Sequence, residues 1–409
     1  MTRLRRRLAR FAVALGLVAG LVVFFASARA EAYPWMIRHG YTQCANCHAD
    51  PAGGGLLNEY GRVQGEILMR TRYDSEPDKE PGPLAEPAFG LFELPRDLLL
   101  GADTRLAYLR TIPLSGKPQG RFILMQADAE AQYSIGRVRA NASLGYVSEG
   151  GNGAAISRSL DNKLVSRIHW VGVDLGKHDE VLVRAGRMNI PFGIRSIEHT
   201  LFVRRETRTD TNASQQYGVE VDYHRGPIRA GVMGIAGNFL VSPDKFRSRG
   251  YAGYAEYAFD PTLAVGVSSM AVNTQLDITL LTPTWRHAHG LFARYSPARV
   301  AVVSAEVDYL HTSAPNTPPP TKLGKVTSGA VGAINVDLEP VQGVHVGPTL
   351  ELVARDFSQP ASVGAWASAW WFFLPHADVR FDTIFNSFPT PGGPATKVVS
   401  GILQVHVYL

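Results

Sequence analysis

Residues 137–146 read RVRANASLGY, and from Val138 to Tyr146 every second residue is apolar. Successive side chains of a β-strand point to opposite faces, so this pattern predicts a strand with one apolar and one polar face. Residues 123–133, ILMQADAEAQY, have the same alternation. Three further segments repeat it: Tyr217–His224, Val303–Tyr309 and Ala377–Phe381. The chain from residue 97 onward is therefore predicted to be rich in amphipathic strands.

Short and long connections alternate along this part of the chain. Tight turns are predicted near Ile135-Gly136, Gly176-Lys177, Arg225-Gly226-Pro227, Asp260-Pro261, Ser296-Pro297, Glu339-Pro340 and Pro375-His376. Eight longer segments lie between them, which gives eight hairpins. A soluble sandwich also alternates apolar and polar residues, but alternating loop lengths are typical of outer-membrane barrels. We therefore expect an all-β fold, an antiparallel transmembrane β-barrel of about 16 strands over residues 97–409.

The two faces of such a barrel predict two environments. We expect Val138, Ala140, Ala142 and Leu144 to face lipid and Arg137, Arg139 and Asn141 to face water. The water-filled lumen would also carry charges of both signs, at Asp128, Glu130, Glu220, Asp222, Glu306, Asp308, Arg380 and Asp382. Aromatic residues at 366 and 370–373 suit either an interfacial girdle or a core. The longest outer segment, Pro191–Gln215, carries four arginines and could fold inward as an anion-selecting constriction or remain solvated.

The start of the chain has the pattern of a secretory signal peptide, predicted over residues 1–30. Arginines precede an apolar stretch from Phe11 to Phe25, and A-x-A sites allow cleavage after Ala30 or Ala32. The formal net charge of +5 becomes about −1 when the six arginines of this segment are removed. The basic balance therefore does not support nucleic-acid binding.

Residues 40–57 read GYTQCANCHADPAGGGLL and contain Cys44, Cys47 and His48 in the order Cys-x-x-Cys-His. This order is the attachment signature of haem c, in which both sulfurs bind the haem vinyl groups and the histidine binds the iron. A redox disulfide or half of a zinc site would share the two cysteines. The chain has no other cysteine, which excludes a four-cysteine zinc site.

The motif lies in a small segment, residues 31–73, that we expect to be partly α-helical. Leu56–Arg70 has the apolar spacing of a short amphipathic helix. Three residues are candidates for the distal iron ligand: Met69, His39 and Met36. A proline-rich acidic linker is predicted over residues 74–96.

This order of segments resembles the fused monohaem cytochrome–porins of the outer membrane, a family that includes outer-membrane iron oxidases. The resemblance rests on the haem motif near the mature start, on Tyr60-Gly61-Arg62 after it, and on the barrel pattern. It implies thioether bonds at Cys44 and Cys47, His48 as proximal ligand, and a place in the outer membrane of a Gram-negative bacterium.

The function that follows is electron transfer between an extracellular donor or acceptor and a periplasmic c-type cytochrome or other carrier. Activity as an extracellular Fe(II) oxidase would be one form of it. The haem segment would lie in the periplasm or within the lumen. Two alternatives remain, a solute porin with a haem-bearing periplasmic plug or docking segment, and a soluble periplasmic haem β protein.

Overall fold

The computed structural model describes residues 33–73, 94–113, 116–146, 164–196, 198, 200–211, 213–278, 280–314, 326–390 and 393–409. The predicted signal peptide and most of the predicted linker lie outside these ranges. Within them, no helix is long and apolar enough to cross a membrane.

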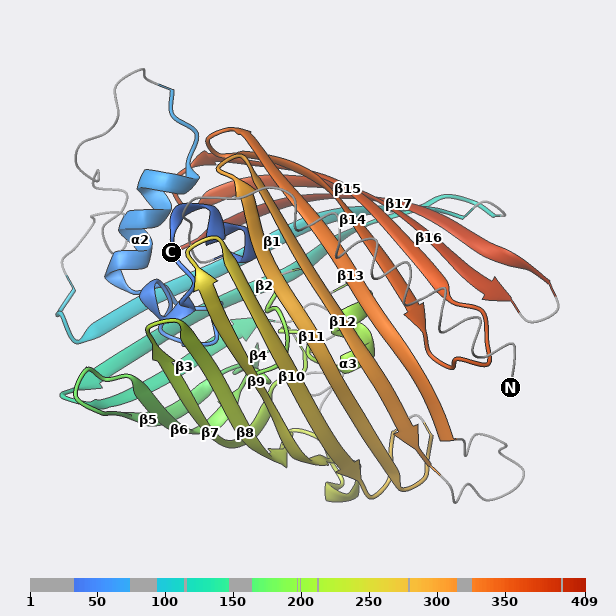
Figure 1. The fold of residues 1–409 in the computed structure, drawn as a ribbon, viewed down its shortest axis with the longest axis horizontal. Helices are drawn as coiled ribbons and strands as arrows, with labels where there is room; N and C mark the ends of the chain where they lie inside the picture. Colours follow the sequence, from blue (N-terminus) through green and yellow to red (C-terminus); the bar gives the residue numbers. More distant parts are fainter. Residues whose placement is uncertain are drawn as a thin grey trace.

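The described chain from residue 98 onward forms one closed antiparallel sheet (Figure 1). Its strands are β1 (Leu98–Pro113), β2 (Gln119–Ile135), β3 (Val138–Tyr146), β4 (Leu164–Val165), β5 (His169–Leu175), β6 (Val181–Met188), β7 (Gln216–Arg225), β8 (Ile228–Gly237), β9 (Ser248–Asp260), β10 (Leu263–Thr274), β11 (Thr284–Ala298), β12 (Ala301–Ser313), β13 (Val326–Val341), β14 (Val344–Ala354), β15 (Ser362–Leu374), β16 (Ala377–Thr390) and β17 (Gly393–Tyr408). Closure comes from β1, which pairs with both β2 and β17. Since β4 and β5 both pair with β3, they are two pieces of one strand, and the barrel has 16 strands as predicted.

Tight turns connect the strands at one end of the barrel, which we call the turn end. Gly136 and Gly226 occupy the left-handed region there, with φ of 58° and 59°, which a residue with a Cβ rarely adopts. The turns predicted near Ser296-Pro297 and Glu339-Pro340 exist but lie two to three residues later, at 299–300 and 342–343. Both prolines lie inside strands, where the register shifts just before the turn, and a bulge tolerates a missing N–H. The last residue also lies at this end, where the Leu409 N–H donates to the Ala102 carbonyl at 2.8 Å.

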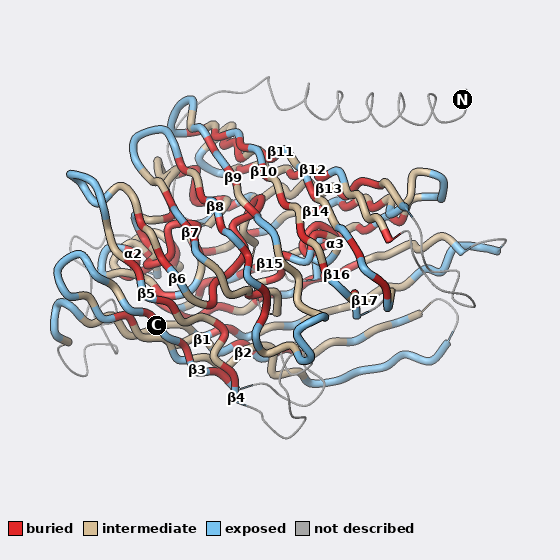
Figure 2. The backbone as a smooth tube through the Cα atoms, turned by 90° about the horizontal axis from the view of Figure 1, so that it is seen from below, coloured by how far each residue is buried: buried red, intermediate tan, exposed pale blue. Residues whose placement is uncertain are grey.

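The two faces of the wall differ as the alternation predicts. Val138, Ala140, Ala142 and Leu144 of β3 are exposed, whereas Asn141 and Ser143 between them are buried. Buried and exposed residues follow one another along many strands in Figure 2. The exposed apolar side chains give the barrel a surface suited to lipid. Arg137 lies in the β2–β3 turn and not on the lumen face of a strand, and its side chain is 54% exposed.

Aromatic residues of β15 divide between the faces. Trp366, Trp370 and Phe372 are buried on the lumen side, and only Trp371 is clearly exposed, at 44%. For the three inward residues the core interpretation holds, because residues separated by an even number share one face of a strand, whereas Trp371 between Trp370 and Phe372 lies on the other.

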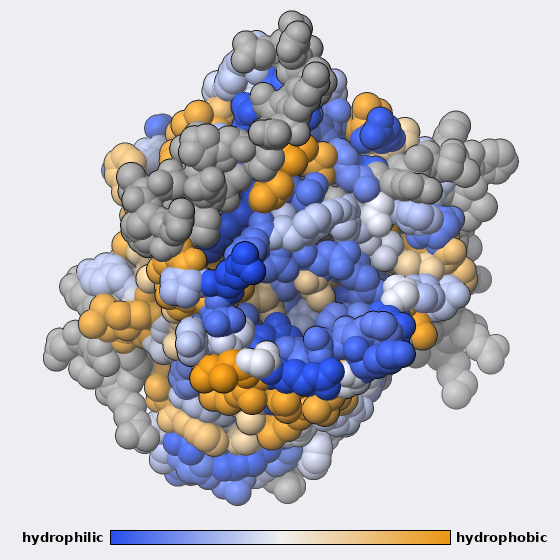
Figure 3. Space-filling model, turned by 90° about the vertical axis from the view of Figure 1, so that its left-hand side faces the viewer, coloured by the Kyte–Doolittle hydropathy of each residue, from blue (hydrophilic) through white to orange (hydrophobic). Residues whose placement is uncertain are grey.

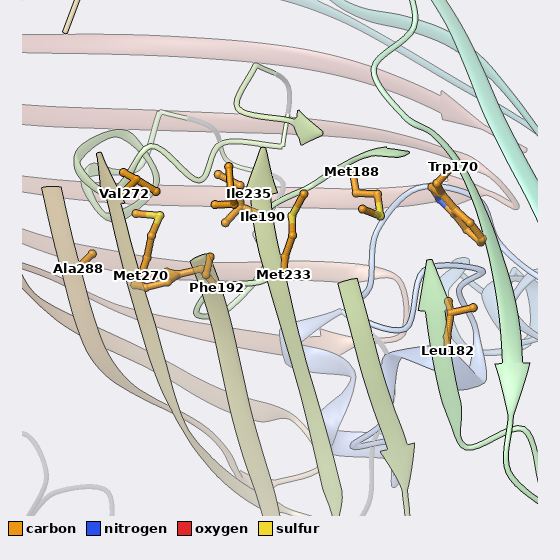
Figure 4. Close-up of a cluster of buried hydrophobic side chains, with 11 residues drawn as sticks. Trp170, Leu182, Met188, Ile190, Phe192, Met233, Ile235, Met270, Val272 and Ala288 are labelled. Carbon is orange, nitrogen blue, oxygen red and sulfur yellow. The ribbon is translucent and has the colours of Figure 1, made fainter. Parts of the chain in front are cut away.

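The segment between β6 and β7 folds into the lumen, and we call residues 189–215 the constriction loop. Ile190 and Phe192 pack on an apolar cluster of the inner wall between β5 and β11 (Figure 4). A short helix, α3 (Phe202–Thr207), follows, and Phe202 and Val203 pack against Val331, Val353, Trp366 and Ile384 on the other side. The loop therefore crosses the lumen.

The arginines of the constriction loop are paired with carboxylates. Arg195 lies 2.8 Å from Asp50, and Arg204 pairs with Glu306 of β12. Arg205 and Arg208 lie 3.1 and 3.4 Å from Glu206 and Asp277. Each arginine of the loop thus has an acidic neighbour, and two of these acids, Asp50 and Glu206, are shared with a second arginine outside the loop, Arg184 and Arg355.

Residues 33–73 lie at the turn end, where the dark-blue chain enters the barrel in Figure 1, and we call them the plug. The plug contains two short 3₁₀ segments, η1 (Pro34–His39) and η2 (Cys44–Asn46), then α2 (Glu59–Gln64) and a wider π turn, η3 (Gly65–Met69). The Asn58 side chain accepts the Gly61 N–H at 2.8 Å and so caps α2. The predicted helix over Leu56–Arg70 is confirmed in type but begins at Glu59.

Candidate functional site

A tight turn brings the three residues of the Cys-x-x-Cys-His motif together. The backbone N–H groups of Cys47 and His48 both donate to the Cys44 carbonyl, at 3.1 and 3.0 Å. An isolated β-bridge between His48 and Leu57 then closes the following loop. Cys44 and Cys47 are buried cysteines, and His48 is partly buried. The packing around His48 lowers the pKa of its ring to about 4, so the ring is neutral at pH 7 and retains a nitrogen lone pair for a metal.

Glycines keep the space beside the motif open. Gly53, Gly54 and Gly55 all have positive φ. A Cβ on Gly53 would lie 2.9 Å from the Cys44 sulfur, and one on Gly61 would lie 2.3 Å from the Cys47 carbonyl oxygen. Side chains at these two positions would displace the motif, so glycine here shapes the cavity next to the thiols.

The motif faces an open cavity between the plug and the barrel wall, and the empty space there, open solvent included, is about 1580 Å³. We call it the haem-motif cavity. Cys44, Cys47 and His48 line it, and so do Met36 and Met69. Figure 3 shows the molecule from this end, with a central hollow bordered mainly by hydrophilic residues.

The three candidates for the distal ligand differ in their position relative to this cavity. Met36 and Met69 belong to one buried cluster with Trp370 and Phe372 as well as lining the cavity. His39 does not line the cavity; its Nε2 lies 4.0 Å from a Glu339 oxygen on β13. Burial lowers the pKa of His39 to about 4, against the opposing charge of Glu339. The structure therefore brings both methionines, but not His39, to the motif.

Buried ion pairs hold the plug in the lumen. Arg38 is fully buried and pairs with Asp337 and with Glu339, the latter at 2.8 Å. On the other side, Asp50 lies 2.9 Å from Arg184 of β6 and 2.8 Å from Arg195. Burial alone would raise the pKa of Asp50, but these two guanidinium groups hold it well below its ordinary value.

A second charged cluster contacts the motif directly. Arg229 of β8 lies 2.6 Å from the Cys44 sulfur, and it shares Glu256 of β9 with Arg294 of β11. Arg294 also donates to the Thr42 carbonyl at 3.0 Å. Across the cavity, Arg105 of β1 and Arg167 line the wall, and Arg167 pairs with Asp128 at 2.8 Å. Cationic side chains thus stand on two opposite sides of the cavity.

Comparison of the fold with solved structures identifies porins and other outer-membrane proteins as similar structures. The chain is similar to OmpT, an outer membrane protein of Vibrio cholerae (10% identity, TM-score 0.55, 78% of this chain and 99% of that one). It is also similar to an anion-selective porin from Comamonas acidovorans (12% identity, TM-score 0.55, 76% and 99%). The outer membrane channel DcaP of Acinetobacter baumannii matches with 10% identity, a TM-score of 0.54, and 78% and 99% coverage. The chain folds as an outer-membrane porin-type barrel.

This likeness is one of fold, since the identities are low. No protein-family model matches the sequence, and no curated protein matches it. The matched portion, about three quarters of the chain, is close in extent to the predicted barrel, residues 97–409.

Several site residues could not be identified from the sequence. Arg184, Arg229 and Arg294 contact the plug only because the closed barrel brings β6, β8 and β11 around it, and Glu256 of β9 pairs with the last two. Asp50 could have been considered from the sequence, because it follows His48 of the motif by two residues. No local pattern distinguishes these barrel arginines from the others on lumen faces.

Proposed function

We propose that this protein is an outer-membrane electron-transfer protein with one covalent haem c inside the turn end of its barrel. The observation that carries the proposal is the haem-motif cavity. Two thiols, one neutral imidazole and two thioether sulfurs, all from the plug, surround one space within the barrel. These are the groups that attach and ligate a c-type haem.

The residues present fit the group and suggest a role for each. Cys44 and Cys47 would form the thioether bonds, His48 would be the proximal ligand, and Met69 or Met36 the distal one. Haem propionates lie on the edge opposite the vinyl groups, so Arg105 and Arg167 across the cavity are suited to bind them. The haem would supply a one-electron redox centre, and methionine ligation would raise its potential relative to histidine ligation.

The position of the plug supports exchange with a periplasmic partner. Porin-type barrels have short turns in the periplasm and long loops outside, so the turn end would face the periplasm. A periplasmic c-type cytochrome could approach the exposed side of the plug. The extracellular partner would reach the haem through the lumen, and soluble Fe(II) is one donor to test.

Solute transport is a second candidate, because the similar structures are porins and channels. Against it, the plug and the constriction loop both occupy the lumen and bind each other through Asp50 and Arg195. A porin whose plug stays in place would conduct poorly. Conductance of the purified protein in a planar bilayer separates the two functions, since an electron-transfer protein needs no open pore.

The decisive experiment tests covalent haem. Outer membranes containing the protein should give a haem-stained band at the mature mass on a denaturing gel. A reduced-minus-oxidised spectrum should show a c-type signal. The double variant Cys44→Ser/Cys47→Ser should lose the stain and keep the heat-modifiable mobility of a folded barrel. Retained covalent haem in that variant would refute the proposal.

A further inference from the structure

Three of the twelve histidines lie together on the outer face of the barrel wall, and we call them the histidine patch. His287 and His289 belong to β11, and His311 of β12 lies directly opposite His287. In β11, Trp285 is 50% exposed, whereas Ala288 is buried. Because residues two positions apart share a face of a strand, and directly opposite residues do so across strands, all three imidazoles lie outside the lumen.

The patch lies close to the end of the barrel that is remote from the turn end. Strand β11 begins at Thr284 and β12 ends at Ser313, and the two strands have 15 and 13 residues. About 9–11 tilted residues cross the hydrocarbon layer, so the ends of these strands extend beyond it. The neighbouring Tyr251 and Tyr309 are each 43% exposed, as suits residues at a membrane interface. The patch is therefore accessible to water.

The distances between the rings are close to those of imidazoles that share a metal ion. The ring centroid of His287 lies 6.0 Å from that of His289 and 5.8 Å from that of His311. Two imidazoles on one tetrahedral ion, with metal–nitrogen bonds of about 2.1 Å, have centroids about 5 Å apart. An inward movement of about 1 Å would therefore let His287 share an ion with either neighbour.

The central ring is free to make this movement. As the side chains stand, no three His, Cys, Asp or Glu residues of the described chain are placed to hold a metal ion. The His287 ring stacks on Trp285 with centroids 6.1 Å apart and has no hydrogen-bond partner within the described chain. Its cross-strand neighbour on β10 is Ala271, which is small and leaves room for a turn of the ring.

The two outer rings are already oriented by serines. Nδ1 of His289 lies 2.9 Å from the Ser269 hydroxyl of β10, and Nδ1 of His311 lies 3.0 Å from the Ser328 hydroxyl of β13. Each serine also lies 3.0 Å from a tyrosine hydroxyl, which holds it in place. Metal-binding histidines commonly donate one ring N–H to a fixed acceptor, and this leaves the other nitrogen for the metal. Here that nitrogen is Nε2 of each ring.

The chemistry of the patch selects the class of ion. No carboxylate lies among the residues that pair with the three histidines on β10, β12 and β13. Magnesium and calcium prefer oxygen ligands, whereas neutral imidazoles suit zinc, copper and nickel. We infer that the histidine patch binds one divalent ion of this transition-metal class, with His287 as the central ligand and His289 and His311 on either side.

This inference is independent of the haem, because no residue of the patch belongs to the plug or lines the haem-motif cavity. Water would complete the coordination of the ion, since the patch supplies three ligands on an exposed surface. The bound ion would link β11 to β12 at the end of the barrel remote from the plug.

The first measurement is calorimetric titration of Zn²⁺ into the purified full-length haem protein, in detergent and without a histidine tag. We expect one saturable site. The variants His287→Ala and His311→Ala should each weaken zinc binding at least about tenfold, since even loss of a group that only orients a metal ligand costs about 10- to 100-fold. His178→Ala is the matched control, because His178 is exposed in a turn at the opposite end of the barrel. Its zinc binding should equal that of the unaltered protein.

A second measurement needs no variant. Cu²⁺ added in equimolar amount to the unaltered protein should give an electron paramagnetic resonance spectrum with hyperfine splitting from imidazole nitrogens. Absence of saturable zinc binding, or an equal loss of it in His178→Ala and His287→Ala, would overturn the site. A copper spectrum that shows only oxygen ligands would overturn it as well. Gel staining for haem on the same preparation is a separate result and bears only on the proposed function.

Discussion

The barrel wall and the plug are held together by different interactions. In the wall, each strand pairs with its neighbours through backbone hydrogen bonds, and alternation of residue type separates lipid from lumen. The plug is built from short helical turns, and its buried charges pair with residues far away in sequence, such as Arg38 with Glu339. The wall is thus specified by local pattern, whereas the shape of the plug depends on the wall around it.

The largest effect is expected when the plug is deleted, because this tests whether the wall folds without it. A chain lacking residues 33–73, with its signal peptide retained, should still fold as a barrel, because the described strands close without help from the plug. Its single-channel conductance should rise several-fold over that of the full-length protein, since a barrel of 16 strands leaves an aqueous channel unless something fills it. Heat-modifiable mobility serves as the folding control. Unchanged conductance in a folded barrel would show that the constriction loop alone closes the pore.

The second test removes one buried ion-pair contact between the plug and the wall. Arg38→Met removes the buried guanidinium and leaves Asp337 and Glu339 without it in the interior, which should cost about 3–5 kcal/mol of plug docking. Hydrogen exchange of residues 33–73 should accelerate strongly while exchange in the strands stays slow. Arg249→Met is the control, because Arg249 and its partner Asp244 are exposed. Equal acceleration of hydrogen exchange in both variants would contradict the idea that the Arg38 ion pairs hold the plug in the barrel.

Sequence reasoning succeeded where structure follows from neighbouring residues. The alternation from Val138 to Leu144 correctly gave the strand and its exposed face, and loop lengths gave 16 strands. Arg137 was misplaced because a period-two pattern does not say where a strand ends and its turn begins. Trp366 and Trp370 were ambiguous because an indole suits either a membrane interface or a packed lumen.

The site was only partly predictable for a related reason. The motif identified Cys44, Cys47 and His48, and helix spacing favoured Met69, which the structure places at the same cavity. Nothing in the sequence located that cavity inside the barrel. The contacts that do so, such as Arg229 with Cys44, span 185 residues and exist only after the sheet closes.

The third test addresses the wall itself. Ala142 lies in the middle of β3 on the exposed face, and Ser143 beside it faces the lumen. A lipid-facing arginine near the midplane costs about 2–4 kcal/mol, so Ala142→Arg should reduce the folded fraction far more than Ser143→Arg. The folded fraction is measured by gel mobility after refolding into lipid vesicles. Equal tolerance at these neighbouring positions would argue against a lipid-facing surface on β3.

The smallest effect is expected for variants of the distal ligand, which should leave the wall and the plug folded and change only the ligation of the haem iron. Met69 and Met36 line the same cavity and belong to the same buried cluster. Met69 is the last residue of the π turn, which is anchored to the turn between β13 and β14. The Gln342 side chain of that turn donates to the Ile67 and Arg70 carbonyls at 2.8 and 3.1 Å. That anchoring favours Met69 as the distal ligand. The ferric protein should then show the weak far-red charge-transfer band of histidine–methionine iron, and Met69→Ala should lose it and have a lower reduction potential.

Met36→Ala and His39→Ala are the matched variants for this last test, since each removes one alternative ligand from the segment before the motif. Both should keep the band, because in our assignment neither side chain binds the iron. Loss of the band in Met36→Ala alone would move the ligand to η1 (Pro34–His39). A change in His39→Ala alone would mean that η1 rearranges when the haem is attached, because in this structure His39 is directed to Glu339 and does not line the cavity.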